Sequence, residues 1–462
     1  FASAYLVFAQ GGKAAVDAGF RYLMVHIAGG LFLLGGIILH YIDTGSILFG
    51  LIEKDGSLAF YMILIGFILN AAVPPLNAWL PDAYPEATVT GAVFMSAFTT
   101  KTAVYVLIRA FPGTEILLWL GTIMTLYGVF YATLQDNFRR LLAYHIVSQV
   151  GYMVTGIGLG TELALNGSVS HAFTHILYKG LLFMGAGSVL YMTGKRNLSD
   201  LGGLHKTMPI TMILYLIAGF SISAFPLFSG FVSKSMIIAA ANHDHKAIVA
   251  LLLTMASAGT FLSTTLKIPY FMFYGKDSGI KAKEPPINML IGMGIAAFLC
   301  IAIGVFPGPL YALLPFPVHF EPYTGEHITG SLGILMFTAL GFFMLLKKLT
   351  PEPTMTIDTD WFYRKGAKVF MWIANKPIAT YEGFVSGFSN TIVLRPLYAV
   401  ARLALSIDKY IVDGAVNGVA SVVLACGSRM RRIQTGLLQH YAVGIIIGIF
   451  AIITVYIAMW RG

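Results

Sequence analysis

The chain has 462 residues, of which 57% are hydrophobic and only 11% are charged, and its mean hydropathy is +0.77. These values lie far outside the range of soluble globular domains, so the sequence predicts an integral membrane protein. Basic loops that face anionic lipid explain the formal net charge of +9, and we infer no nucleic-acid binding from it.

Eleven stretches approach the roughly 20 apolar residues that a helix needs to cross a hydrocarbon core about 30 Å thick. Their length and the lack of two-residue alternation predict an all-α, polytopic transmembrane helix bundle and exclude a β-barrel. Residues 1–9 are apolar, but nine residues are too few to cross the membrane. We therefore interpret them as the second half of a truncated transmembrane helix. The expected spans lie near residues 22–42, 58–78, 90–111, 115–134, 141–160, 168–192, 209–242, 247–274, 286–313, 329–346 and 441–460.

Basic residues are distributed unevenly when successive loops are assigned to alternate sides of the membrane. The short loops of one side hold little beyond Lys54 and Lys246. By the positive-inside rule, the other side is cytoplasmic. That side holds Lys13, Arg21, Arg139, Arg140, Lys195, Arg196, Lys206, Lys276, Lys281 and Lys283.

Proline interrupts two of the expected spans in related ways. The stretch NAAVPPLNAWLPDAYP contains Pro74 and Pro75, and the stretch SAFPLFSGFVSK contains Pro226. Proline removes a backbone donor, and lipid cannot replace the lost hydrogen bond. Paired broken helices in two halves of a chain predict a transporter built from inverted repeats, whereas simple proline kinks are the alternative.

Three basic residues lie inside one expected span, in the stretch HAFTHILYKG. His171, His175 and Lys179 are four residues apart, so they lie along one face of a helix. A lysine at the bilayer centre costs about 3 kcal/mol on insertion scales and normally faces a cavity or a partner. Because histidine both gives and takes a proton near neutral pH, the triplet predicts a proton relay. Two core histidines and a lysine that reaches the interface are the alternative.

Two further lysines are expected at membrane depth. Lys101 lies ten residues into a span, and Lys234 follows the second break, where freed backbone carbonyls can solvate an ammonium group. Lys267 is closer to a helix end, so we interpret it as mainly structural. The expected spans contain buried lysines but few carboxylates. This composition favours the transport of protons over a site in which several carboxylates coordinate a metal cation. Asp136 and His145 are candidate lining residues of a half-channel.

The sequence contains no motif for a cofactor or a metal ion. Cys300 and Cys426 are far apart and have no metal-ligand spacing, so they are expected to be packing residues. There is also no phosphate-binding loop. We therefore expect no cofactor, no metal site and no catalytic residue in this chain.

The long segment before the last span has the pattern of a helix lying along a membrane or a partner protein. Leu397, Val400, Ala404, Ile407 and Ile411 recur at helical spacing, while charged residues occupy other faces. An ordinary cytoplasmic domain is the alternative. Trp460 and Arg461 are expected to anchor the last span at the interface. The expected parts are a truncated helix at 1–9, a proton-translocation core at 10–274, additional helices at 275–350, a cytoplasmic-side amphipathic lateral segment at 351–439 and a final helix at 440–462.

Four motifs, in this order along roughly residues 1–270, resemble a known family of membrane subunits. It comprises the antiporter-like subunits shared by respiratory complex I, membrane-bound hydrogenases and Mrp-type Na+/H+ antiporters, and the D-type antiporter subunit is the nearest. The tail stretch RRIQTGLLQHYAVG looks like the end of the long complex I subunit that carries a lateral helix. The motifs are PPLNAWLPDAYPEATVTGAVFMSAFTTKTAVYVLIR, LQDNFRRLLAYHIVSQVGYM, HAFTHILYKGLLFMGAGSV and FPLFSGFVSK.

The resemblance implies two inverted half-channels joined by a line of polar residues at the membrane midplane. Lys101 matches the family's lysine in the connecting helix, and Lys234 matches the lysine of the second broken helix. Asn70 stands where the family usually has the lysine of the first broken helix. Asparagine orients water but carries no charge, so Asn70 is expected to line the first half-channel without switching it. The central positions of the line match His171, His175 and Lys179.

The resulting functional hypothesis is a proton-translocating membrane subunit of a multisubunit monovalent cation/proton antiporter, with Na+ as the expected cation. Three alternatives stay open: a proton-pumping subunit of a complex I-like or membrane-bound hydrogenase complex, a non-conducting membrane scaffold, and an energy-coupling subunit for inorganic-carbon uptake. The expected partners are other membrane subunits, the lipid bilayer and the transported ions. The expected location is the inner or cell membrane of a bacterium or an archaeon.

Overall fold

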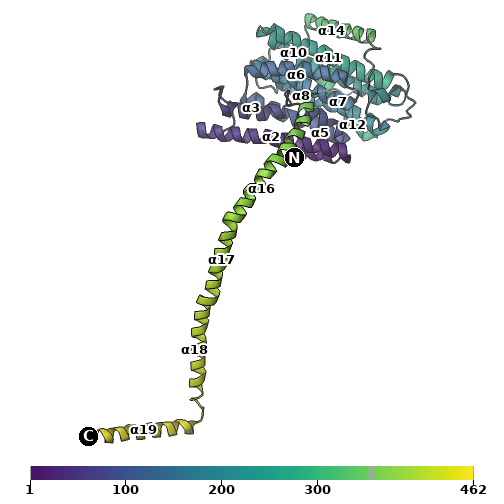
Figure 1. Cartoon of the computed structure of the whole chain (residues 1–462). Coiled ribbons are helices and arrows are strands. Elements are labelled where there is room, and N and C mark those ends of the chain that lie inside the picture. The colour runs from purple at the N-terminus through teal and green to yellow at the C-terminus, as the bar shows by residue number, and fades with distance from the viewer. Residues whose placement is uncertain (1, 353–357, 461–462) are drawn as a thin grey trace. The chain divides into compact units, whose positions relative to one another are not determined.

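The computed structural model describes residues 2–352 and 358–460, and within these ranges it contains helices but no strands (Figure 1). The chain divides into two units, Phe1–Arg364 and Lys365–Gly462. Nine helices of the described residues are long and apolar enough to cross a membrane. The predicted all-α, polytopic membrane fold is therefore confirmed. Phe1 and the expected anchor Arg461 lie outside the described residues.

The first unit is a bundle in which several helices begin at polar caps. Ser57, Thr88 and Asn137 each accept a hydrogen bond from a backbone N–H group in the first turn. Its elements up to the second break are α1 (Ala2–Phe8), α2 (Gly12–Thr44), α3 (Leu58–Asn70), α4 (Trp79–Ala83), η1 (Tyr84–Glu86), α5 (Val89–Ala110), α6 (Glu115–Leu134), α7 (Phe138–Leu159), α8 (Glu162–Thr193), η2 (Leu198–Asp200), η3 (Leu204–Lys206) and α9 (Pro209–Ile222).

After the second break the bundle continues with α10 (Ser229–His243), α11 (Ala247–Thr260), the π-helical segments η4 (Phe261–Lys267) and η5 (Tyr270–Tyr274), α12 (Ile287–Val305), α13 (Gly308–Tyr311) and α14 (Gly325–Met344). Helix α8 contacts α5, α7, α9, α10 and α12, and it lies inside the bundle (Figure 1). Nearly every residue of α7 is buried. These two helices form the centre of the unit.

Two of the expected spans are interrupted in the structure, as their prolines predicted. The stretch expected near 58–78 is helical only as far as Asn70, and the stretch near 209–242 is divided into α9 and α10. The expected span near 286–313 also ends early, at Val305. Proline explains the first two endings, since it supplies no backbone donor to continue the hydrogen-bond ladder.

The two breaks have the same backbone hydrogen-bond pattern. After α3, the backbone N–H groups of residues 71, 72 and 73 donate to the carbonyl groups that lie four, three and five residues earlier in the chain. After α9, the N–H groups of residues 223, 224 and 225 do the same. The middle residue of each trio is an alanine in the left-handed region, Ala72 at φ 59° and Ala224 at φ 56°, a rare conformation for a residue with a side chain. The same pattern also follows α10, with His245 at φ 57°, so it is a way of ending a helix that is not confined to the two breaks, and the internal repeat stays a prediction.

Residues 358–364 attach to the bundle through two buried carboxylates. Asp358 accepts hydrogen bonds from hydroxyl groups on α6 and α7. Asp82 on α4 accepts from two guanidinium groups at 2.6 and 2.9 Å. The donors are Tyr127 and Tyr144 for Asp358, and Arg21 and Arg364 for Asp82.

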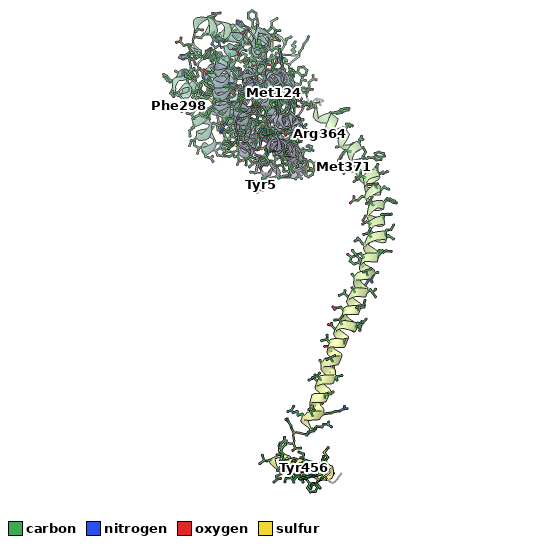
Figure 2. The ribbon with its side chains drawn as sticks, turned by 90° about the vertical axis from the view of Figure 1, so that its left-hand side faces the viewer. Tyr5, Met124, Phe298, Arg364, Met371 and Tyr456 are labelled. Carbon is green, nitrogen blue, oxygen red and sulfur yellow. The ribbon has the colours of Figure 1, made fainter. Side chains whose placement is uncertain are left out.

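The second unit is one long helical segment followed by a separate apolar helix. The helical segment runs over Arg364–Arg431, and its described side chains are almost all exposed; Met371 is among them (Figure 2). It starts in α15 (Asp360–Ile373) and continues through η6 (Ala374–Ile378), α16 (Ala379–Phe388), η7 (Ser389–Leu394), α17 (Arg395–Ile407), η8 (Asp408–Val412) and α18 (Asp413–Arg431), before α19 (Leu438–Trp460). The lateral, amphipathic role of the segment stays a prediction.

Candidate functional site

A row of basic side chains is buried inside the first unit. Lys101 comes from α5, Lys234 from α10, and the other three from one face of α8. All five are buried, and all except Lys101 have no exposed surface. The three side chains from α8 are His171, His175 and Lys179. The structure therefore buries the five residues that the sequence singled out as a proton path, on three helices of which α8 contacts the other two.

The imidazole of His171 lies within hydrogen-bond distance of two side-chain hydroxyl groups. Its Nδ1 atom lies 3.0 Å from the Ser233 hydroxyl oxygen on α10, and its Nε2 atom lies 3.3 Å from the Tyr178 hydroxyl oxygen. The Tyr178 hydroxyl also lies 3.4 Å from the side-chain oxygen of Gln149 on α7. Polar groups of three helices thus meet at this histidine.

His175 and Lys179 differ from His171, because their side-chain nitrogen atoms have no hydrogen-bond partner among the described residues. The ring centroids of His171 and His175 are 6.4 Å apart. The Lys179 ammonium group lies 5.8 Å from the Phe183 ring centroid, which is at the outer limit of a cation–π contact. On α8, His175 lies one helical turn from His171 and one turn from Lys179.

The Lys234 ammonium group lies at the second break. It donates to the Ile222 carbonyl at 2.7 Å and to the Ser257 hydroxyl at 3.5 Å, and it lies 4.8 Å from the Tyr152 ring centroid. Ile222 is the last residue of α9, so its carbonyl has no helical partner. The contact is the one expected from the sequence, a freed carbonyl that solvates an ammonium group.

Lys234 also lines a cavity of about 420 Å³ between α10, α11 and the first half of α14. Hydroxyl groups are frequent in the cavity wall, and α14 adds a carboxylate and an imidazole, Glu326 and His327. The His327 ring stacks on Phe231 at 4.5 Å between centroids. The other polar side chains of the wall are Ser223, Ser235, Thr254, Ser257, Thr324 and Ser331.

Lys101 is bonded within its own helix. Its ammonium group donates to the Ser96 carbonyl at 2.5 Å and lies 3.4 Å from the Thr100 hydroxyl oxygen. No ion pair joins Lys101, Lys179 or Lys234 to a carboxylate in the described part of the chain. The charge of these lysines is therefore not balanced by a carboxylate in direct contact with them.

The two further candidates, His145 and Asp136, lie in different places. His145 is fully buried on α7, and its Nε2 atom is 2.7 Å from the Ser263 hydroxyl oxygen. Asp136 precedes α7 and accepts from the Ser199 backbone and hydroxyl groups at 2.9 and 2.6 Å. Lys267, interpreted as structural, donates to the carbonyl groups of Thr133 and Gln135 at the end of α6.

Asn70 has a histidine partner that the sequence reasoning missed. The Nε2 atom of His26, on α2, lies 3.2 Å from the Asn70 side-chain oxygen. The sequence reasoning did not single out His26 in the span 22–42, because no titratable residue follows it three or four positions later. Only its position beside Asn70 distinguishes it. No group of metal-ligating side chains occurs among the residues that the structure describes.

Intramembrane lysines and histidines within a helix bundle are typical of polytopic membrane proteins that conduct ions or protons. The sequence model of the transmembrane family described as NADH:quinone oxidoreductase/Mrp antiporter matches residues 2–263. The chain belongs to this family, which confirms the predicted resemblance. It is a multi-pass membrane protein, and its relatives come from bacteria and archaea.

Individual relatives are similar over parts of their length. The D-type subunit of the Na+/H+ antiporter of Alkalihalophilus pseudofirmus is 31% identical, over 63% of this chain and 62% of that protein. The first few curated relatives are covered over 50% to 67% of their own length. The chain therefore spans about half to two thirds of them.

Solved structures of two membrane complexes contain similar chains. The Mrp complex from Dietzia sp. matches with 25% identity and a TM-score of 0.61, over 67% of this chain and 69% of that one. The archaeal membrane-bound sulfane sulfur reductase matches with 26% identity and a TM-score of 0.63, over 98% of this chain and 78% of that one. The second match includes residues after the bundle.

Proposed function

We propose that this chain is a proton-translocating membrane subunit of a multisubunit monovalent cation/proton antiporter, with Na+ as the exchanged cation. Protons pass along Lys101, His171, His175, Lys179 and Lys234. The single observation that carries the proposal is the row of these five side chains, buried across three helices without a carboxylate partner in the described residues. The similarity to the D-type subunit of a Na+/H+ antiporter supports the choice of cation.

The row suits protons because each member exists in two protonation states. Lysine alternates between ammonium and amine, and histidine between imidazolium and imidazole. Arginine, in contrast, stays protonated in proteins, and none of the five positions is an arginine. A proton can therefore be received and passed on at every step.

Water is expected to connect the members of the row. Buried polar atoms normally have hydrogen-bond partners, and buried waters supply them where protein groups do not. His175 and Lys179 lack a protein partner, and so do six hydroxyl groups in the described structure, among them those of Ser148, Ser170 and Ser229. These residues belong to α7, α8 and α10, so a chain of water along the row would satisfy them.

The cavity at Lys234 provides an exit on one side of the membrane. Its wall includes the first turns of α14, and α14 follows a loop on the side opposite the basic loops. That side is the outer one by the positive-inside rule. We therefore expect protons to exchange with the outside through Lys234, Glu326 and His327.

The coupling to a cation requires other membrane subunits. The similar chains in solved structures belong to multisubunit membrane complexes. Binding of a cation by a neighbouring subunit would change the protonation of the lysine row electrostatically. By reciprocity, protonation of the row changes the affinity for the cation by the same factor.

Alanine substitutions test the proton path in membrane vesicles that contain the whole complex. Lys179→Ala and Lys234→Ala should each lower Na+-dependent proton transport more than about tenfold, because each removes one obligatory carrier. Dye fluorescence that reports the pH gradient measures the effect, and co-purification of neighbouring subunits shows that the complex still assembles. Lys13→Ala, at an exposed position on α2, is the matched control and should keep normal transport.

Normal transport by either alanine variant would contradict the proposal. It would favour the non-conducting scaffold, in which the five buried side chains have only a packing role.

A second candidate function is a proton-pumping subunit of a respiratory complex. The observation that favours it is the match to the archaeal respiratory complex over 98% of this chain, against 67% for the Mrp complex. Purification of the intact assembly distinguishes the two. Co-purifying subunits with redox cofactors, and acidification driven by an electron donor without Na+, would establish the second candidate.

A further inference from the structure

The first helix break has a titratable side chain of its own, His26. This residue lies on α2, and Asn70 is the last residue of α3 before the break. The His26 Nε2 atom lies 3.2 Å from the Asn70 side-chain oxygen, and the His26 Nδ1 atom lies 2.8 Å from the Tyr22 carbonyl oxygen. Both residues are half-buried, so a protonated and a neutral imidazole are each compatible with the site.

The hydrogen bonds of His26 allow two protonation states. A carbonyl oxygen only accepts, so Nδ1 carries a hydrogen and donates it to the Tyr22 carbonyl. With the Asn70 oxygen facing Nε2, the imidazole donates from both nitrogens and is therefore protonated. When the amide turns over, its NH2 group donates to Nε2, and the imidazole is neutral. Asn70 thus offers a matching hydrogen bond to either form.

Aromatic rings fix the plane of the imidazole. Its ring lies over Tyr22 with centroids 4.1 Å apart and meets the edge of Trp79 at 4.5 Å. The Trp79 indole N–H donates to the Leu69 carbonyl at 3.0 Å, next to Asn70. Because the imidazole is held on two sides, the Asn70 amide is the group that can rotate.

The other charged groups of this region are engaged elsewhere. Arg21, beside Tyr22 on α2, and Arg364 both bind Asp82 of α4. Glu86 of η1 pairs with Arg196 at 2.9 Å. The further titratable side chains on the elements that pack against α2 are Tyr5 on α1, Tyr61 on α3 and Tyr84 on η1.

A related arrangement occurs at the second break. There the long helix α8 places the His171 Nδ1 atom 3.0 Å from the hydroxyl oxygen of Ser233, the fifth residue of α10 after the break. At the first break, the long helix α2 places His26 beside the end of α3. Near each break, a histidine from a preceding long helix thus has a polar side chain beside it.

We propose that His26 is the proton-carrying group of the first half of the bundle and that Asn70 is its positioning residue. The Asn70 amide turns over as His26 gains and loses a proton. This inference rests on the proposed proton-transport function, and it adds a carrier that the row of lysines and histidines does not include.

The test uses the whole complex in vesicles and four variants. His26→Gln keeps a hydrogen-bonding side chain but cannot titrate, and it should lower proton transport at least about tenfold. Asn70→Leu removes the amide and should lower transport to a similar extent, whereas Asn70→Gln, which keeps an amide, should retain a substantial part. His40→Gln, on the same helix α2, is the control and should keep normal transport.

A double variant separates proton carrying from a structural role. In the His26→Gln background, Asn70→Lys supplies a titratable ammonium group at the same break and should restore transport at least severalfold. A purely structural role for His26 predicts no restoration. Normal transport by His26→Gln, or failure of the double variant to recover when the complex is assembled, would overturn the inference.

Lys179→Ala, measured in parallel, distinguishes this inference from the proposed function. If Lys179→Ala abolishes transport while His26→Gln does not, the proton row stands and His26 has no carrier role. If Lys179→Ala also transports normally, the proposed function itself is wrong.

Discussion

The contacts of the buried lysines differ from one residue to the next. The differences indicate which lysine exchanges a proton with the outside most easily. Lys234 is solvated by a freed carbonyl and opens onto a cavity, whereas Lys179 is enclosed and has no polar partner among the described residues. An enclosed cation is costly, and a cation next to polar groups and a cavity is much less so. Lys234 is therefore the position at which we expect a proton to exchange most easily with the outside.

Glu326 provides a test of that exchange at the scale of one residue. Glu326→Gln keeps the shape of the cavity wall but removes a proton acceptor on the expected outer side. We expect proton transport to fall severalfold but not to vanish, because His327 and the hydroxyl groups of the wall remain. The vesicle assay measures it. The control is Glu321→Gln, an exposed carboxylate in the preceding loop, and an equal loss in both variants would contradict a specific role of the cavity.

At the scale of elements, glycines let the central helices approach closely. A methyl group added at Gly128 of α6 would lie 2.5 Å from the Ser148 backbone nitrogen of α7, and one added at Gly151 would lie 2.7 Å from the Thr125 backbone nitrogen. Backbone atoms of a packed helix cannot move aside cheaply, and small residues are typical of such contacts in membranes. The α6–α7 pair therefore positions the buried α7 side chains, including His145.

Gly128→Ala tests this packing against a matched glycine. The added methyl group should destabilise the bundle by about 1–3 kcal/mol, because it forces the two backbones apart. Gly180→Ala, on α8, should be nearly neutral, since its methyl group would meet only a Val93 side-chain atom at 3.9 Å. Thermal unfolding in detergent compares the two variants. Equal stability would show that α6 and α7 separate without cost.

At the scale of the whole molecule, the chain combines a bundle that has its own core with a second unit whose described residues form no core. The bundle holds the buried clusters, whereas the described residues of Lys365–Gly462 are almost entirely exposed, with many apolar side chains among them. Exposed apolar surface of this extent needs lipid or another protein to cover it. We therefore expect the second unit to contact the bilayer and neighbouring subunits.

Substitutions along α17 and η8 test that expectation without shortening the chain. Replacement of Leu397, Val400 and Ile411 by asparagine should reduce co-purification of neighbouring subunits severalfold, because it removes the apolar face. Replacement of Arg402, Asp408 and Lys409 by asparagine, on the other faces, should have a smaller effect. The thermal stability of the bundle should change little in both variants. Equal losses of the neighbours would contradict recognition by the apolar face.

Much of the fold was determined by the sequence through local rules. Long apolar runs predicted most of the spanning helices, and proline predicted both breaks, since each effect depends on a short stretch of chain. The spacing of four residues placed His171, His175 and Lys179 on one face before any tertiary contact was known. The exact end of α3 at Asn70 was missed, because it depends on backbone hydrogen bonds after the break.

Only the tertiary structure decided which polar groups meet. His26 and Asn70 are 44 positions apart, and neither predicts the other. The cavity joins Lys234 to Glu326 and His327 on a helix much later in the chain. The physical reason is that hydrogen bonds and cavities depend on distances between helices. These distances are set by packing over the whole bundle, whereas hydropathy and helical periodicity act within a single segment.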